Sequence, residues 1–205
     1  MSTIALQSAT LVFGFPLFAL MFNAQWRYLS HFQAKRCALF MGLILLGGPA
    51  TEVFFNTVYT WLFGQPLWVY QALPIAGGST SWYAFFIWSL YGINVYFIDQ
   101  RLAHSRTKRL HSYAIKSLIM GIEGPMLEVF FNLVFLAISG GILVHYVPAD
   151  TWHFTSWQVM PIYAWCGLWA AIWVDMLDKY ISWALIAALW GMGILSLLGI
   201  AYFGV

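Results

Sequence analysis

Long apolar runs and short polar connections alternate along the chain. Six runs approach or exceed the length of about 17 to 25 residues that a helix needs to cross a bilayer; they cover roughly 5–23, 37–63, 81–98, 112–146, 158–174 and 181–203. Backbone polar groups find no partner in lipid, so such runs form helices. The pattern predicts an all-α fold: a polytopic membrane helical bundle of about six transmembrane helices, forming a single transmembrane domain over residues 1–205.

Composition agrees with this prediction. The chain is 62% hydrophobic and only 8% charged, with a mean hydropathy of +0.77. These values lie far from those of a soluble domain of this length. We therefore expect an integral, multi-pass membrane protein with membrane lipids around it. The net charge of +2 resides in the connections between the runs, so it indicates topology, and we expect no nucleic-acid partner.

The basic residues predict the orientation of the chain. All nine lie in or beside three connections: Arg27, Lys35, Arg36, Arg101, Arg106, Lys108, Arg109, Lys116 and Lys179. The other two connections, roughly 64–80 and 147–157, contain no Lys or Arg. By the positive-inside rule, the basic loops are cytoplasmic and both termini lie on the outer side of the membrane.

Two stretches of the chain are nearly identical. "GPATEVFFN" begins at Gly48, and "GPMLEVFFN" begins at Gly124. "TSW" also occurs twice, at 80–82 and 155–157. We predict a duplicated helix pair with copies at about 37–99 and 112–175, flanked by helices at 5–23 and 181–203. An even number of crossings separates the copies, which predicts parallel repeats related by an axis along the membrane normal.

Each copy places a carboxyl group and an amide within its apolar helix. Glu52 and Asn56 are four residues apart and share a helix face, as do Glu128 and Asn132. An ionisable group at this depth is by default a candidate functional residue. Burial and a like-charged neighbour favour the neutral acid, so we expect Glu52 and Glu128 to serve as catalytic acid and base. The alternative is that the four groups only bond one another and clamp the two copies together.

Aromatic residues accompany these acids. Aromatic faces stabilise cations without attacking them, so we expect the substrate to be bound by the two amides together with nearby aromatic rings: Asn56, Asn132, Phe55, Phe131, Trp88, Tyr91, Trp165 and Trp169. Asp99 and Asp175 correspond between the copies and are further candidates. They end the second helix of each copy, near the cytoplasmic boundary, away from the acids. Glu123 is expected to point elsewhere, toward the first or last span.

The motif Pro-x-x-Glu-Val-Phe-Phe resembles the Pro-x-Glu-Glu-x-x-Phe-Phe signature of the membrane-embedded lycopene cyclases of the heterodimeric and fused type. A mid-helix Glu followed by a Trp- and Tyr-rich helix is also similar to the membrane terpene cyclases of fungal meroterpenoid pathways. The chain departs from the lycopene cyclase signature at its first Glu, where it has Thr51 and Leu127. The resemblance implies that an acidic residue starts ring closure by protonation, with Glu52 and Glu128 as the candidate acid and base.

These observations predict a membrane-embedded terpenoid cyclase, an isomerase or lyase, that acts on an apolar, lipid-like isoprenoid by carbocation chemistry. We expect neither a cofactor nor a metal, because the five histidines lie in loops or at span ends. One alternative is a small proton- or cation-coupled transporter, and a second is a non-catalytic subunit of a membrane complex. Self-association of identical chains is also left open.

Overall fold

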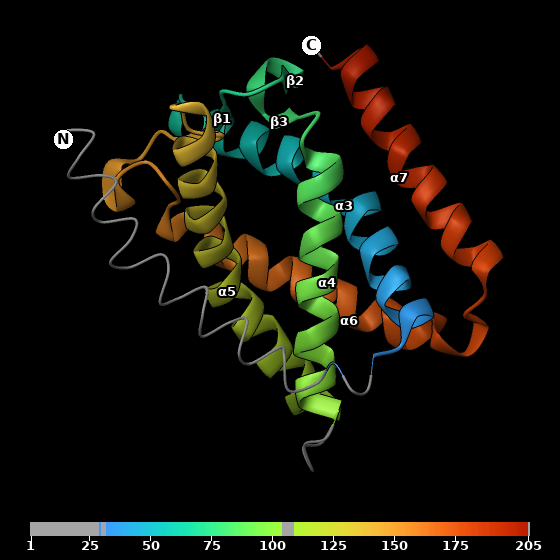
Figure 1. Ribbon diagram of the computed structural model, residues 1–205. Helices are drawn as coiled ribbons and strands as arrows, with labels where there is room; N and C mark the ends of the chain where they lie inside the picture. Colours follow the sequence, from blue (N-terminus) through green and yellow to red (C-terminus); the bar gives the residue numbers. More distant parts are fainter. Residues whose placement is uncertain (1–28, 30–31, 104–108, 205) are drawn as a thin grey trace.

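The computed structural model describes residue 29 and residues 32–103 and 109–204 of the chain. Within this part, five long helices form the bundle (Figure 1): α3 (Ala34–Phe63), α4 (Ala84–Ala103), α5 (Arg109–Ser139), α6 (Met160–Leu177) and α7 (Trp183–Phe203). The predicted all-α class is confirmed. The predicted helix at 5–23 lies outside the described residues.

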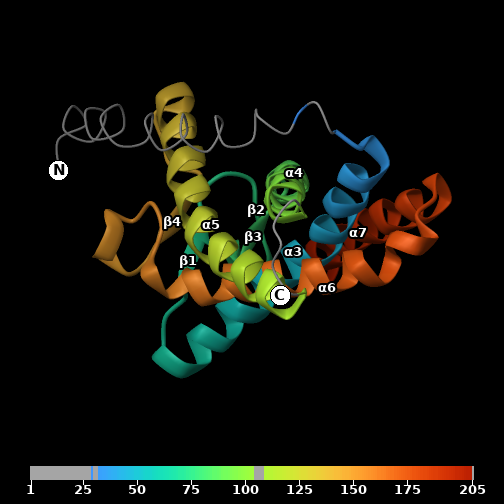
Figure 2. The ribbon, with the colours of Figure 1, turned by 90° about the horizontal axis from the view of Figure 1, so that it is seen from below.

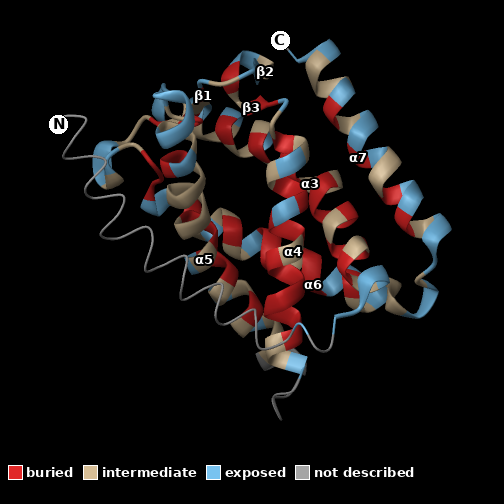
Figure 3. Ribbon diagram, viewed as in Figure 1, coloured by how far each residue is buried: buried red, intermediate tan, exposed pale blue. Residues whose placement is uncertain are grey.

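Four segments of the described chain are long and apolar enough to cross a membrane, as expected for a membrane protein. They are Ala34–Phe63, Ser112–Ser139, Trp157–Tyr180 and Trp183–Phe203. The helix predicted at 81–98 is present as α4, but it is not one of the four. Its buried face carries Asn94, Asp99 and Gln100, which lower its hydropathy. Helix α4 lies among the other helices, and most of its second half is buried (Figure 3).

Helix α3 holds the bundle together. It packs against α4, α6 and α7, while α5 packs mainly against α6 and also meets α4. Figure 2, seen from below, shows α6 running across the bundle and crossing α3 and α5. Helix α7 contacts mainly α3 and stands at one side of the bundle. Its other faces are exposed (Figure 3). Such exposure is expected of an apolar helix that contacts lipid.

Short strands and 3-10 turns occupy one end of the bundle, which we call the strand end. The two segments between the helices there were predicted as loops at roughly 64–80 and 147–157. Together with the residues beside them, they contain β1 (Trp68–Tyr70), β2 (Pro74–Ile75), η3 (Ala76–Gly78), β3 (Thr80–Ser81), β4 (Val144–Tyr146), η4 (Ala149–Thr151) and η5 (Trp157–Val159). The opposite end, where α4 ends and η6 (Asp178–Tyr180) follows α6, is called the charged end. The C-terminus lies at the strand end (Figure 1).

The apolar run predicted to span 112–146 ends as a helix at Ser139. Gly140 follows with a φ of 75°, a left-handed conformation that glycine adopts without strain and that ends helices. The rest of the run, from Val144 to Tyr146, becomes strand β4. Apolar length alone therefore overestimated this helix by seven residues.

Strands β1 and β4 join the two halves of the chain. They are antiparallel, and Trp68, Val69 and Tyr70 pair with Tyr146, His145 and Val144. The flanking backbone bonds are matched, since Gln71 N donates to Leu143 O at 2.9 Å and Val147 N donates to Leu67 O at 3.0 Å. Each residue of β1 corresponds in the repeat to the residue 76 positions later in β4. Exchanging corresponding residues turns the pairing into itself, so the ladder is two-fold symmetric about the pair Val69 and His145.

Two glycines allow close packing at equivalent places. A Cβ atom on Gly48 would lie 2.2 Å from Trp88 Cδ2, and one on Gly124 would lie 2.3 Å from Tyr163 Cγ. Both glycines immediately precede the prolines within the helices, Pro49 in α3 and Pro125 in α5. The aromatic ring thus lies directly on the helix backbone in each half.

Gly48→Ala is expected to destabilise the protein by about 1–3 kcal/mol, because the indole of Trp88 must move from its buried position. The control is Gly191→Ala in α7, where an added Cβ has no neighbour within 4 Å and alanine favours the helix. Thermal unfolding in detergent measures both variants. Equal melting temperatures for the two variants would refute the close contact between Gly48 and Trp88.

Candidate functional site

Glu52 and Glu128 line one cavity between the helices and the strand end of the bundle. Glu52 on α3 is buried, and Glu128 on α5 is partly buried. The cavity has a volume of about 20 Å³ and is lined by the two acids, Thr51, Trp68, Tyr70, Trp88, Tyr146, Val159, Ile162 and Tyr163. No lysine or arginine of the described residues forms an ion pair with either acid. The two predicted acids therefore share one site without a cationic partner.

Side chains from the strand end hold the carboxyl group of Glu52. The Tyr70 hydroxyl donates to Oε1, and the Thr80 hydroxyl donates to Oε2. The pKa of Tyr70 is raised well above its usual value, mainly by burial and secondly by the charge of the neighbouring Glu52. Tyr70 therefore keeps its proton and remains a hydrogen-bond donor to the acid.

Glu128 is held in the same way, with one additional donor. The Tyr146 hydroxyl donates to Oε1 and the Thr155 hydroxyl donates to Oε2, the latter at 2.5 Å. Tyr163 on α6 also donates to Oε1, at 2.5 Å. Tyr146 follows Tyr70 by 76 positions, and Thr155 follows Thr80 by 75. Trp88 takes the place of Tyr163 in the first half, so the two acids differ in their third neighbour.

Asn56 fixes the chain that follows α3. Its Oδ1 accepts from Leu67 N at 2.8 Å and from Trp68 N at 3.3 Å. Its Nδ2 donates to Trp68 O and to Ser79 Oγ, both at 3.1 Å. The amide group therefore makes its hydrogen bonds to residues at the strand end of its own half.

Asn132 does the same after α5. Its Oδ1 accepts from Leu143 N at 3.0 Å and from Val144 N at 2.9 Å, and its Nδ2 donates to Val144 O at 2.9 Å and to Phe154 O at 2.8 Å. We predicted Asn56 and Asn132 as substrate-binding residues. Because their amides are bonded to loop backbone, a structural role replaces that assignment. The contacts of the described residues also do not include the direct clamp between acids and amides that was the alternative.

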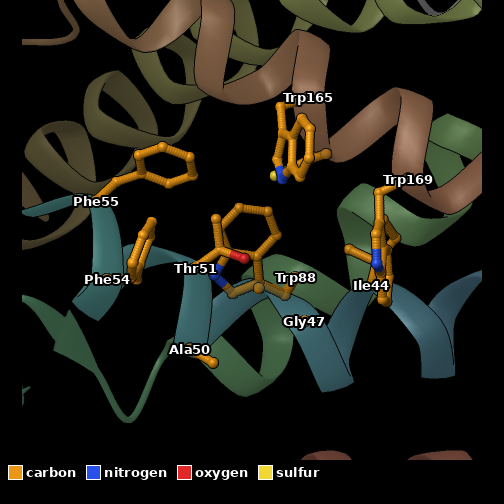
Figure 4. Close-up of a pocket in the computed structure, with 11 residues that line it drawn as sticks. Ile44, Gly47, Ala50, Thr51, Phe54, Phe55, Trp88, Trp165 and Trp169 are labelled. Carbon is orange, nitrogen blue, oxygen red and sulfur yellow. The ribbon is translucent and has the colours of Figure 1, made fainter.

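A larger apolar pocket lies beside the acid cavity. Its volume is about 370 Å³, and its lining comes from α3, α4 and α6: Ile44, Gly47, Gly48, Ala50, Thr51, Phe54, Phe55, Trp88, Trp165, Cys166 and Trp169. Figure 4 shows side chains of α6 facing those of α3, with the ring of Trp88 between them. At the mouth, Phe54 is 60% exposed and Trp165 is 58% exposed, whereas Trp88 at the floor is 4% exposed. The pocket thus opens between α3 and α6, at the middle of these apolar helices.

Thr51 and Trp88 separate the two spaces, since both residues line the apolar pocket and the acid cavity. Trp88 also packs against Tyr91 and Tyr163, with ring centroids 5.5 Å and 6.2 Å away, and the last two stack on each other at 5.3 Å. The Tyr91 hydroxyl donates to Gly124 O at 2.6 Å. Nε1 of Trp88 is buried and has no hydrogen-bond partner among the described residues.

The structure therefore divides the predicted aromatic residues into two groups. Phe55, Trp88, Trp165 and Trp169 line the apolar pocket. Tyr91 and Phe131 do not belong to that lining; they contact each other, with ring centroids 6.3 Å apart, on the other side of Trp88. Tyr91 and Phe131 are placed to support the wall around the acids.

Asp99 and Asp175 lie at the charged end, away from the acid cavity. Arg36 Nη2 lies 3.1 Å from Asp99 Oδ2 and 4.0 Å from Asp175 Oδ1, and Arg36 Nη1 lies 2.6 Å from Asp178 Oδ1. Lys116 Nζ also pairs with Asp99 Oδ1. These contacts tie α3, α4, α5 and α6 together at one end, which gives the aspartates a structural role in this conformation.

Glu123 faces α4. Its Oε1 lies 2.8 Å from Arg101 Nη2, and its Oε2 accepts from Asn94 Nδ2 at 3.2 Å. The expected direction toward the last span was wrong, because Arg101, at the end of α4, reaches back to α5; the first span lies outside the described residues. Glu123 takes no part in lining the acid cavity.

Comparison of the chain with protein-family models, with curated proteins and with solved structures finds no match. Function is therefore inferred from the geometry of the site. Two carboxyl groups share one cavity, hydroxyl groups orient both, and an aromatic wall separates them from an apolar pocket at membrane depth.

Proposed function

We propose that the protein is a membrane-embedded isomerase that cyclises an apolar, isoprenoid-type substrate by carboxylic-acid protonation and carbocation chemistry. The observation that carries the proposal is the placement of Glu52 and Glu128 in one cavity without a cationic partner in the described chain, beside an aromatic pocket. One acid protonates a carbon–carbon double bond of the substrate. The resulting cation closes a ring, and the other carboxylate removes a proton, so that mass is conserved.

The apolar pocket supports an apolar substrate. Its volume of about 370 Å³ falls within the range of roughly 300–1,000 Å³ common for small-molecule sites. Its mouth lies between two helices that are apolar enough to span a membrane, so a lipid-soluble molecule reaches it without crossing water. Tryptophan and phenylalanine rings around the pocket stabilise positive charge on a reacting carbon skeleton. The proposal agrees with the resemblance of the Pro-x-x-Glu motifs to membrane terpenoid cyclases.

We further propose that the two halves arose by duplication and lie in the same direction across the membrane, in a chain of six spans. Equivalent residues make equivalent contacts in both halves: Tyr70 and Tyr146 contact the acids, and Asn56 and Asn132 hold the backbone of the following segment. The two-fold ladder between β1 and β4 supports an axis through the strand end. The basic loops would then face the cytoplasm.

The function is tested by expressing the protein in a host that supplies linear polyprenoids. Lipid extracts are separated and analysed by mass spectrometry. The expected result is a new compound with the mass of a host polyprenoid and a different retention time, formed without added metal or nucleotide. Extracts identical to those of the host alone, across polyprenoids of several lengths and with the protein present in the membrane, would count against the cyclase.

A further inference from the structure

We infer that the cavity between Glu52 and Glu128 is a binding site for a single water molecule, held by the indole N–H of Trp88 and by both carboxyl groups. The site itself stands on geometry. Its role as a proton carrier rests on the proposed function.

The volume of the cavity suits one water. A cavity holds a water molecule when about 10–15 Å³ is open to the centre of a water-sized sphere. In this cavity about 20 Å³ is open in that sense. A buried water also needs two to four polar partners. Polar groups of the lining include the two acids and the indole N–H of Trp88, which has no other partner among the described residues and belongs to a side chain that is almost fully buried.

The hydrogen-bonding capacity of the acids leaves room for this water. Each carboxylate oxygen accepts up to two hydrogen bonds. Glu52 accepts one at each oxygen, from Tyr70 and Thr80. Glu128 accepts two at Oε1 and one at Oε2. A water that accepts from Trp88 and donates to Glu52 and Glu128 makes three bonds, the usual number for an internal water.

Trp88 and Tyr163 occupy equivalent places in the two halves, and the difference between them explains why the water lies beside Glu52. Tyr163 extends a hydroxyl group to Glu128 directly, at 2.5 Å. Trp88 occupies the equivalent place beside Glu52, and its Nε1 lies close to that acid but outside the geometry of a direct hydrogen bond. The water completes on one side the contact that a hydroxyl group makes on the other.

Such a water resets the acids after each reaction. Once one carboxyl group has given its proton to the substrate and the other has taken one from the cation, the protonated carboxyl group donates to the water oxygen. The water passes one of its own protons to the carboxylate, so one O–H bond breaks and one forms at each end and the total charge is unchanged.

The water is tested by nuclear magnetic resonance on protein labelled with ¹⁵N-tryptophan in detergent micelles. The indole signal of Trp88 is identified by its loss in Trp88→Phe. The expected result is a cross-peak between this indole proton and water, with the sign of dipolar contact and not of chemical exchange. Absence of that cross-peak from the wild-type protein overturns the inference, whatever the variants do.

Infrared spectroscopy in H₂¹⁸O gives a second readout. Trp88→Tyr places a hydroxyl group where the second half has Tyr163, so that it reaches Glu52 directly and displaces the water; one ¹⁸O-sensitive O–H band is expected to disappear. Trp165→Phe is the control, because Trp165 lines only the apolar pocket, and it keeps the band. A band that survives Trp88→Tyr overturns the inference. Failure of the cyclase experiment leaves both water measurements intact, so the two proposals fail separately.

Discussion

Glu52→Gln and Glu128→Gln are each expected to lower the rate of product formation by about 10²- to 10⁴-fold, the usual contribution of a general acid or base. Glutamine keeps the size of the side chain and one acceptor oxygen, but it neither donates a proton to an alkene nor accepts one from a cation. The hydroxyl groups of Tyr70 and Tyr146 still find an oxygen to bond, so the fold is retained. Product formed per amount of membrane-inserted protein is the measurement.

Glu123→Gln is the matched control for these variants. Glu123 lies five residues before Glu128 on the same helix, contacts Arg101 and Asn94, and does not line the acid cavity. Its replacement is expected to leave product formation per amount of folded protein within about two-fold, since Glu123 does not touch the acid cavity. The proposed function would be wrong if Glu52→Gln and Glu128→Gln each behaved like this control.

Asn132→Leu is expected to destabilise the protein by about 2–6 kcal/mol, because the N–H groups of Leu143 and Val144 lose their acceptor, at about 1–3 kcal/mol for each buried group left unpaired. Both residues are buried, and Val144 pairs with Tyr70 in the ladder. The variant therefore loosens strand β4 as well as the segment that carries Thr155. Thermal unfolding in detergent and limited proteolysis within 140–157 measure the two effects.

Gln71→Leu is the control for Asn132→Leu. Gln71 lies at the same end of the bundle, is exposed, and makes only a long side-chain contact with Val69 O, at 3.5 Å. Its effect is expected to stay within about 0.5 kcal/mol. If Asn132→Leu melted within a degree of this control and resisted protease equally well, the structural role of the amide would be refuted.

The helices could be predicted because a membrane makes apolar length informative. Helices α3 and α7 fall close to the predicted bounds. The prediction failed where another force decided the outcome. Gly140 ended α5 early, and β1 paired with β4 across a separation of 76 residues, which no local pattern of apolar residues encodes.

The acids of the site were found from their spacing, but their partners were not. Glu52 and Glu128 stood out because carboxyl groups are rare in apolar helices. Tyr70 and Thr155 come from segments that looked like ordinary connections, and Tyr146 ends the apolar run that was predicted as a helix over 112–146. Their signal was present in the repeat, since "TSW" contains Thr80 and Thr155, but a repeat does not say which side chains fold inward.

The difference between Trp88 and Tyr163 has a consequence for how such a site evolves. Two copies of one polypeptide, arranged around an axis, are obliged to present the same residue on both sides. A single chain that contributes both sides escapes this constraint, and substitution of one residue alters one acid and spares the other. Division of labour between two chemically identical carboxyl groups thus becomes accessible to mutation one position at a time.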